Sequence, residues 1–445
     1  MRRIPPMRIL LAAGGSLALG LCIELTPARA QVSTMGGVNG PPLEAPPVAT
    51  DREDIFVRPN RSEDALIVGD WLAYPSAFTG VVYDTNVSQS TAAKASPGMR
   101  LAPALLAESD NDLFKTQLYG NADGRFYFNN IPGNGTIISA RAGATEAYSP
   151  MRDFVVDAQA DFTRQRDLFS TLGADQSVVT LNPTGIGLAP TSNPVSYDQF
   201  SGAASVQKNF ARAFVTIGGS IVDIAYDQDS AGAVAPSPNG TTYTGRIRGG
   251  FWIFPALYAY LEGGADNRDF DASSLNSAGF RTVAGVGTDR IGLMRGEIFA
   301  GYQQEDFNSV IVGTVSDPVY GVRGYYYPLP DLTFDVSADQ SLGVSLLSSA
   351  GTLPGTATKV GTYLMTADYA LADAWRALVR AGYISTYYVG SPRRDDAWTV
   401  GGTVTYNMYQ SLGLTLDYQH MRLSSNAVGA SFSRDVVTLG ATWRY

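Results

Sequence analysis

Arginine and carboxylate side chains that alternate with apolar residues are the groups of this chain best suited to chemistry. Two aspartates alternate with apolar residues in the segment 332–339, and two arginines alternate with alanine and valine in the segment 376–381. Opposed charges on one face of a strand orient polar solutes and set the ion preference of a water-filled pore. By this parity we expect a pore lined by Arg246, Arg248, Glu262, Asp266, Arg295, Glu297, Arg323, Asp335, Asp339, Arg376, Arg380 and Asp417. The alternative is that these charges pair with one another and only keep the interior hydrated.

Four tyrosines share the parity of the charged set: Tyr258, Tyr260, Tyr325 and Tyr327. A tyrosine has a flat apolar face and a polar tip, which is what stacking on a sugar ring requires. We therefore expect these residues to be sugar-stacking surfaces inside the pore.

Candidates for catalysis and metal binding are few. The single histidine, His420, has no sequence signature of a hydrolase around it, and we interpret it as a rim residue. The glycine pair Gly285 and Gly287 is typical of strand packing and not of a phosphate loop. The acidic pairs Glu305-Asp306 and Asp395-Asp396 are either loop ligands for divalent cations or solvated loop charge. We predict a protein that is not an enzyme and has no metal site and no cofactor.

Strands that separate polar from apolar residues must position these groups. In 412–419, leucines and Tyr418 fall on one face, and Thr415, Asp417 and Gln419 fall on the other. Charges on the inner face of a soluble sandwich would be costly to bury. A water-filled interior beside a lipid-facing wall satisfies both faces. The sequence therefore predicts an all-β protein, a transmembrane antiparallel up-and-down β-barrel.

The connections between strands alternate between short and long. Short turns are expected at eight places, among them Ser149-Pro150 and Asp289-Arg290, and longer polar connections lie between them. This alternation is typical of outer-membrane barrels and gives about 18 strands, with 16 as the alternative because the segment 135–148 is a weak strand. The longest loop, 168–195, carries no charge except Asp175 and either narrows the mouth or forms an external flap.

The two ends of the chain indicate export to an outer membrane. A basic start, an apolar run and Ala28-Arg29-Ala30 predict a signal peptide over 1–30, whose removal would take away the only cysteine, Cys22. A Pro- and Gly-rich periplasmic lead segment is expected over 31–64, and the barrel over 65–445. We expect 437–445, which ends on an aromatic residue, to be the closing strand.

Several segments are similar to a known family. Gly69-Asp-Trp-Leu-Ala-Tyr-Pro-Ser76 with Tyr83-Asp-Thr-Asn86 resembles the first strand of the β-barrel porins associated with bacterial exopolysaccharide operons. Later strands of that family resemble Tyr260-Leu-Glu-Gly-Gly-Ala-Asp-Asn-Arg268, Gly296-Glu-Ile-Phe-Ala-Gly-Tyr-Gln-Gln-Glu-Asp306 and Tyr320-Gly-Val-Arg-Gly-Tyr-Tyr-Tyr-Pro328. The resemblance covers nearly the whole mature chain. It implies an outer-membrane barrel, in some members one that passes a secreted polysaccharide.

Three functions remain open: a passive channel for exopolysaccharide export or for sugars, a general small-solute porin, and a structural or adhesive surface barrel without transport. The net charge of −9 argues against nucleic acid as a partner. Expected partners are outer-membrane lipid and lipopolysaccharide, the outer-membrane assembly machinery through the C-terminal strand, and a periplasmic polysaccharide-export protein. The expected location is the outer membrane of a Gram-negative cell.

Overall fold

The structure is a computed structural model that describes residues 65–111, 113–129, 135–165, 196–226, 239–308, 312–344, 357–372, 374–409 and 411–444. The predicted signal peptide, the lead segment and the loop 168–195 lie outside these residues, so those expectations stay predictions. Within the described ranges, no helix has the length and apolar character to cross a membrane.

The described residues form an antiparallel sheet with one short 3-10 helix, η2, at Ser273–Leu275. The strands are β1 Leu66–Val68, β2 Trp71–Asp84, β3 Ser96–Asp110, β4 Phe114–Tyr127, β5 Thr136–Met151, β6 Phe154–Gln165, β7 Tyr197–Asn209, β8 Ala213–Tyr226, β9 Gly240–Phe254, β10 Leu257–Phe270, β11 Ser277–Ile291, β12 Met294–Phe307, β13 Thr314–Leu329, β14 Leu332–Val344, β15 Ala357–Ala372, β16 Trp375–Tyr388, β17 Arg394–Tyr409, β18 Leu412–Ser425 and β19 Phe432–Arg444.

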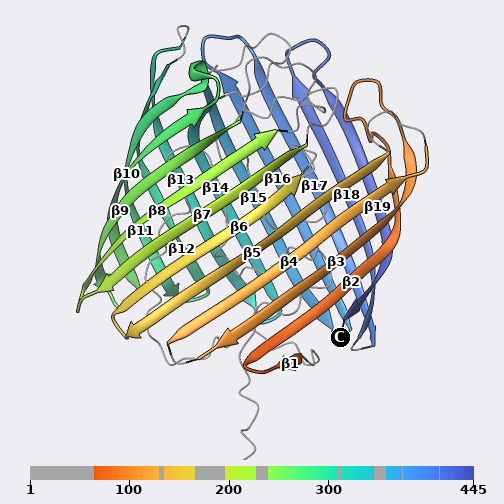
Figure 1. Cartoon of the computed structure of the whole chain (residues 1–445), viewed down its shortest axis with the longest axis horizontal. Helices are drawn as coiled ribbons and strands as arrows, with labels where there is room; N and C mark the ends of the chain where they lie inside the picture. The colour runs from red at the N-terminus through yellow and green to blue at the C-terminus, as the bar shows by residue number, and fades with distance from the viewer. Residues whose placement is uncertain are drawn as a thin grey trace, which may run out of the picture.

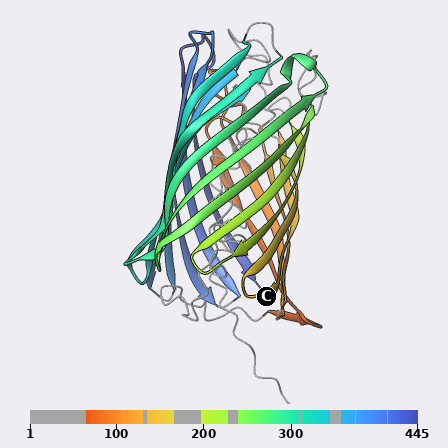
Figure 2. The ribbon, with the colours of Figure 1, turned by 90° about the vertical axis from the view of Figure 1, so that its left-hand side faces the viewer.

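Strands β2 to β19 close into a tilted barrel (Figure 1 and Figure 2). Each strand pairs with the next, and β19 pairs with β2, where Val437 lies opposite Tyr83. The predicted closing strand and the count of 18 barrel strands are therefore confirmed, and 16 is excluded. The additional strand β1 pairs with the start of β2, at the same end of the barrel as the C-terminus (Figure 1).

Short turns follow the odd-numbered strands from β3 to β17, and longer connections follow the even-numbered strands, as the sequence predicted. Three turns lie a few residues later than expected: those predicted at Ser149-Pro150, at Asp289-Arg290 and at Asn407-Met408, the last of which falls inside β17. The turn after β11 is at Gly292-Leu293 because Gly292 has φ +61°, a left-handed conformation that glycine adopts without strain. Pro150 lies in β5 beside a register irregularity, where a strand tolerates proline.

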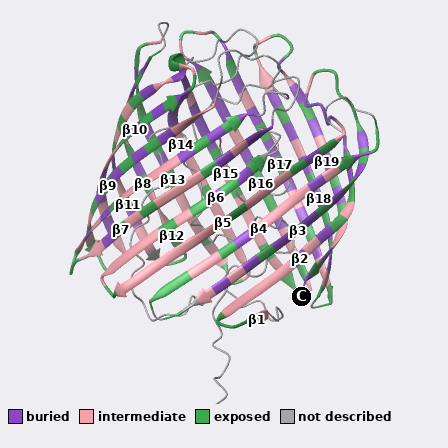
Figure 3. Cartoon of the chain, in the orientation of Figure 1, coloured by how far each residue is buried: buried purple, intermediate pink, exposed green. Residues whose placement is uncertain are grey.

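Burial alternates along the strands, and the polar side is the buried one (Figure 3). In β18, Thr415 and Asp417 are buried, while Leu414, Leu416 and Tyr418 are exposed. A water-soluble sandwich buries its apolar residues, so this inverted pattern identifies the outer face as the face toward lipid. Every charged residue on the buried face therefore belongs to the interior of the barrel.

Candidate functional site: the inner wall of the barrel

Charged residues of the inner wall meet in ion pairs that cross the strands. Arg380 on β16 donates to Asp417 on β18 at 2.5 Å and to Thr403, which lies on the strand between them, at 3.0 Å. Arg434 on β19 holds Asp84 on β2 at 2.7 Å across the closing seam. The sequence allowed two arrangements, charges that face a solute and charges that pair with one another. These contacts are of the second kind.

Arg248 is bound to two carboxylates of the inner wall. Its Nε donates to Glu262 at 2.8 Å and its Nη1 to Glu297 at 3.0 Å, and the residue is 1% exposed. Glu262 lies on β10 and Glu297 on β12, and β11 lies between these two strands. The inward-facing residues of β11 beside Tyr260 and Glu297 are Gly285 and Gly287. Because these glycines have no side chains, one arginine can reach carboxylates from both β10 and β12.

Tyr258 and Tyr260 are packed into the wall. Each ring lies over the glycine opposite it in the ladder, Gly287 and Gly285 respectively. The Arg248 guanidinium covers the Tyr260 ring at 4.0 Å. These contacts occupy the rings; the role in sugar stacking stays a prediction, as it does for Tyr325 and Tyr327, whose rings stack on each other at 6.3 Å.

The predicted pore-lining residues divide by exposure. Buried positions are Arg246, Arg248, Glu262, Asp266, Arg380 and Asp417, and half-buried ones are Glu297, Arg323, Asp335, Asp339 and Arg376. Arg295 is exposed and stands 4.0 Å from Asp289, and Arg376 is paired with Asp368. Arg323 is the register partner of Glu297. The half-buried and exposed members are the ones a passing solute can reach, so their part in a pore remains the prediction to test.

Sequence reasoning missed several inner-wall charges. Arg141 pairs with Asp161 at 2.6 Å and covers the Tyr119 ring, but it lies in the segment 135–148, whose alternation is too weak to assign its residues to a face. Arg281 covers the Phe299 ring at 5.0 Å. Each of these arginines lies an even number of residues from an inward-facing glycine of its own strand, Arg141 from Gly143 and Arg281 from Gly285. This spacing was the signal in the sequence that would have identified them as inward-facing.

The acidic pairs Glu305-Asp306 and Asp395-Asp396 were expected in loops, either as cation ligands or as solvated charge, but they lie in β12 and β17, so the placement in loops is wrong. Neighbouring residues in a strand point to opposite faces, so the two carboxylates of each pair diverge. Glu305 faces inward beside Arg268, while Asp306 faces outward and accepts from Thr314. Within the described ranges, no cluster of three or more His, Cys, Asp or Glu side chains is arranged to hold a metal ion.

His420 lies on the outward-facing side of β18. Its Nδ1 is 2.8 Å from Asp435, and the Tyr418 hydroxyl donates to the same carboxylate at 2.8 Å. This pair faces the surroundings of the barrel and not its interior.

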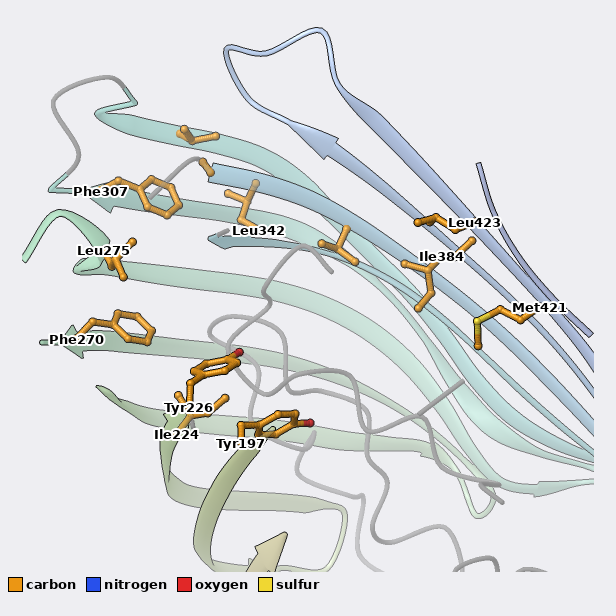
Figure 4. Close-up of a cluster of buried hydrophobic side chains, with 14 of the residues drawn as sticks. Tyr197, Ile224, Tyr226, Phe270, Leu275, Phe307, Leu342, Ile384, Met421 and Leu423 are labelled. Carbon is orange, nitrogen blue, oxygen red and sulfur yellow. The ribbon is translucent and has the colours of Figure 1, made fainter. Parts of the chain in front are cut away.

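A cluster of buried apolar side chains lies at the loop end of the inner wall (Figure 4), beside the buried charges of Asp266, Arg268 and Glu305. We call this cluster the apolar collar; it comprises Tyr197, Ile224, Tyr226, Phe270, Leu275, Phe307, Val315, Leu342, Ala357, Val360, Ile384, Ala397, Met421, Leu423 and Phe432. The residues come from β7, β8, β10, η2 and β12 to β19, near the long loops. The interior therefore has a charged and hydroxyl-lined body, and its loop end combines the apolar collar with buried ion pairs such as Arg393 with Asp395.

The family comparison decides what kind of barrel this is. A family model described as "Putative beta-barrel porin 2" matches residues 66–445. The chain belongs to this porin family. Fold and family together make the protein an outer-membrane β-barrel of the porin type, located in the outer membrane.

Solved structures similar to this porin have low identity to it. The siderophore receptor PirA from Acinetobacter baumannii is 8% identical, with a TM-score of 0.41 over 84% of this chain and 80% of its own. OccAB4 from Acinetobacter baumannii is 11% identical, with a TM-score of 0.40 over 87% of this chain and 100% of its own. An anion-selective porin from Comamonas acidovorans is 12% identical, with a TM-score of 0.34 over 84% and 99%. No curated protein matches the chain.

Proposed function

We propose that this porin is a passive channel for polysaccharide of the exopolysaccharide class, or for smaller sugars, and that it is not an enzyme. The observation that carries the proposal is the inner wall of β15 to β19. Besides ion pairs, the polar side of these strands is built from threonines that are buried in the wall: Thr358, Thr362, Thr386, Thr399, Thr403, Thr405, Thr415, Thr438 and Thr442. Threonine hydroxyls keep this side of the wall polar without adding charge, which suits the passage of an uncharged hydrophilic solute.

The pairing of the inner charges supports an uncharged solute. Arg380 with Asp417 and Arg434 with Asp84 each cancel a positive and a negative charge at close range. A wall of paired charges stays hydrated without a strong field of one sign, so it does not select strongly for ions. The resemblance to porins of exopolysaccharide operons points to the same substrate class.

A general small-solute porin is the second candidate. Arg323 is half-buried and lies opposite Glu297 in the ladder of β12 and β13, and Tyr325 lies opposite Asp335 in the neighbouring ladder of β13 and β14. A charged strip of this kind acts as the selective part of a pore if it stands at the narrowest level.

Planar-bilayer recording separates the candidates. The polysaccharide channel is expected to conduct ions weakly selectively and to lose current when a neutral oligosaccharide is added. A small-solute porin keeps its current in the oligosaccharide and shows clear ion selectivity. A barrel with no conductance, together with unchanged polysaccharide secretion after gene deletion, rejects both and leaves a structural or adhesive role.

Export and assembly are part of the proposal. Cleavage after Ala30 would start the mature chain at Gln31 and remove its only cysteine. The C-terminal strand is the proposed signal for the outer-membrane assembly machinery, and a periplasmic polysaccharide-export protein is the proposed partner at the short-turn end. Intact-mass measurement of protein from purified outer membranes tests the cleavage; a mass that includes residues 1–30 contradicts it.

A further inference from the structure

The connection between β2 and β3, residues 85–95, folds into the barrel at its loop end. Val87 is fully buried and belongs to a cluster with inward-facing side chains of β2, β4, β5 and β19, namely Val82, Tyr127, Ile137 and Val436. The polar neighbours Asn86, Ser88 and Gln89 are buried as well. A connection that stood away from the barrel would leave such side chains in water. The stretch 86–89, which we call the first inward segment, therefore lies inside the rim.

Hydrogen bonds hold the first inward segment in place. The Asn86 side-chain amide donates to the Ser433 carbonyl of β19 at 3.0 Å, and the Ser88 hydroxyl donates to the Asn86 side-chain oxygen at 3.2 Å. Gln89 has φ +49°, a left-handed conformation that residues with a Cβ rarely adopt, and its N–H donates to the Asn86 carbonyl at 3.1 Å. Because the segment is fastened to the wall in this way, a change of rotamer at a single side chain does not move its backbone out of the interior.

The end of β14 lies on the inner side of the wall. The Leu342 N–H donates to the Gln303 side chain on β12 at 3.1 Å, and Arg268 on β10 donates to the Leu342 carbonyl at 3.5 Å. Gln303 and Arg268 are themselves inward-facing and fully buried. Ser341, Leu342 and Gly343 are all buried, whereas the residues of a wall strand alternate between two faces. The backbone at 341–343 therefore lies over the inner faces of β10 and β12.

The connection between β10 and β11, residues 271–276, turns inward beside the end of β14. Leu275 of η2 is fully buried and lies with Phe270 and Leu342 in the apolar collar (Figure 4). The Phe270 N–H donates to the Asn276 side-chain oxygen at 2.7 Å, which fastens the connection to the end of β10. We call 271–276 together with 341–343 the second inward segment.

The two inward segments enter the interior from opposite sides. In the closed order of the 18 barrel strands, β10 and β11 lie halfway round from β2 and β3. Figure 1 shows β10 at the left of the barrel and β2 at the right. We propose that the two segments form a fixed constriction at the loop end, and that this constriction sets the largest solute that passes. At the level of Arg323 and Glu297 the groups that reach inward are side chains, which can change rotamer, whereas both segments bring hydrogen-bonded backbone into the interior. The inference rests on the proposed channel.

Shortening the first connection tests the constriction in planar bilayers. In the full-length protein, residues 86–94 are replaced by Asn-Gly, a two-residue turn that suits the hairpin because the ladder of β2 and β3 ends at Asp84 and Ser96. The single-channel conductance is expected to rise about twofold, since it increases with the open cross-section of a pore, and larger polyethylene glycols should enter. Replacing 427–429 by one glycine is the control, because Val428 in that connection is 95% exposed, and it should leave the conductance unchanged. An unchanged conductance in the shortened protein, with the folded band retained in heat-modifiability electrophoresis, overturns the constriction.

Single substitutions test both segments at full chain length. Val87→Asp and Leu275→Asp each place a carboxylate among buried apolar side chains, so the segment that carries it is expected to leave the interior. Each folded variant should conduct more than the wild-type protein, whereas Val428→Asp adds the same charge at an exposed position and should not. If neither variant conducts more than Val428→Asp, the constriction is overturned and the channel itself stands. If the wild-type protein and all variants lack conductance, the proposed channel is rejected and the constriction with it.

Discussion

Tyr260 lies so close over Gly285 that a methyl group on the glycine would overlap the ring, with the Tyr260 Cε1 2.6 Å from the Cβ position. The two residues are cross-strand partners on β10 and β11. The Arg248 guanidinium lies over the same ring, 4.0 Å from its centroid. Glycine, tyrosine and arginine are therefore packed one against the next at this point of the inner wall.

Substituting Gly285 tests this layering. Gly285→Ala is expected to destabilise the barrel by about 1–3 kcal/mol, because the added methyl forces Tyr260 out of its position. Equilibrium unfolding in urea from detergent micelles measures the change. Gly263→Ala is the control, since Gly263 faces outward with open space around its Cβ position. Equal effects of the two substitutions contradict the layered packing.

Breaking the pair of Arg380 and Asp417 tests the buried ion pairs. Arg380→Met leaves the Asp417 carboxylate buried without its cation, and we expect a loss of about 3 kcal/mol in the free energy of unfolding. Adding Asp417→Leu to Arg380→Met is expected to recover most of that loss, because no charge is then left uncompensated. A double variant less stable than Arg380→Met shows that the carboxylate is stabilised by other groups.

Charge reversal at Arg323 tests the selective strip. Arg323→Glu is expected to shift the reversal potential in a salt gradient toward cation preference, since it places a carboxylate opposite Glu297 on the inner wall. Arg394→Glu provides the same change of net charge on the outward-facing side of β17, beside Asp396, and should leave the reversal potential unchanged. An unshifted potential for Arg323→Glu shows that the residue does not stand at the narrow part of the pore.

Removing Asp84 tests the closing seam of β2 and β19. Asp84 accepts from Arg434 at 2.7 Å and from the Tyr127 hydroxyl at 2.9 Å, so it ties β19 to β2 and to β4. Asp84→Asn is expected to lower the temperature at which the folded band is lost in heat-modifiability electrophoresis. Asp198→Asn is the control, because Asp198 forms an exposed pair with Arg164 away from the junction of β2 and β19. An exposed pair contributes about 0–1 kcal/mol. If Asp198→Asn lowers this temperature more than Asp84→Asn does, the contacts of Asp84 do not hold β2 and β19 together.

Local patterns in the sequence determined the class of fold, the alternation of turns and the face to which each strand residue belongs. The period of two along a strand depends only on the residues of that strand, so Thr415 and Asp417 were assigned to the polar face correctly. The terminal alternation of 437–445 likewise determined that this segment is a strand, and 18 followed from counting turns.

Only the tertiary structure decided which groups meet. The partners of Arg248 lie on β10 and β12, and their contact depends on the registers of three ladders and on glycines in the strand between. Tyr258 and Tyr260 have the predicted parity, but their rings are taken up by packing, which parity does not report. The end of the β13–β14 ladder at Gly321 and Asp339 likewise depends on how the two strands are placed in the barrel. The face on which a residue lies depends on its own strand alone. Which side chains of different strands meet depends on the closed barrel, because closure sets the stagger between neighbouring strands.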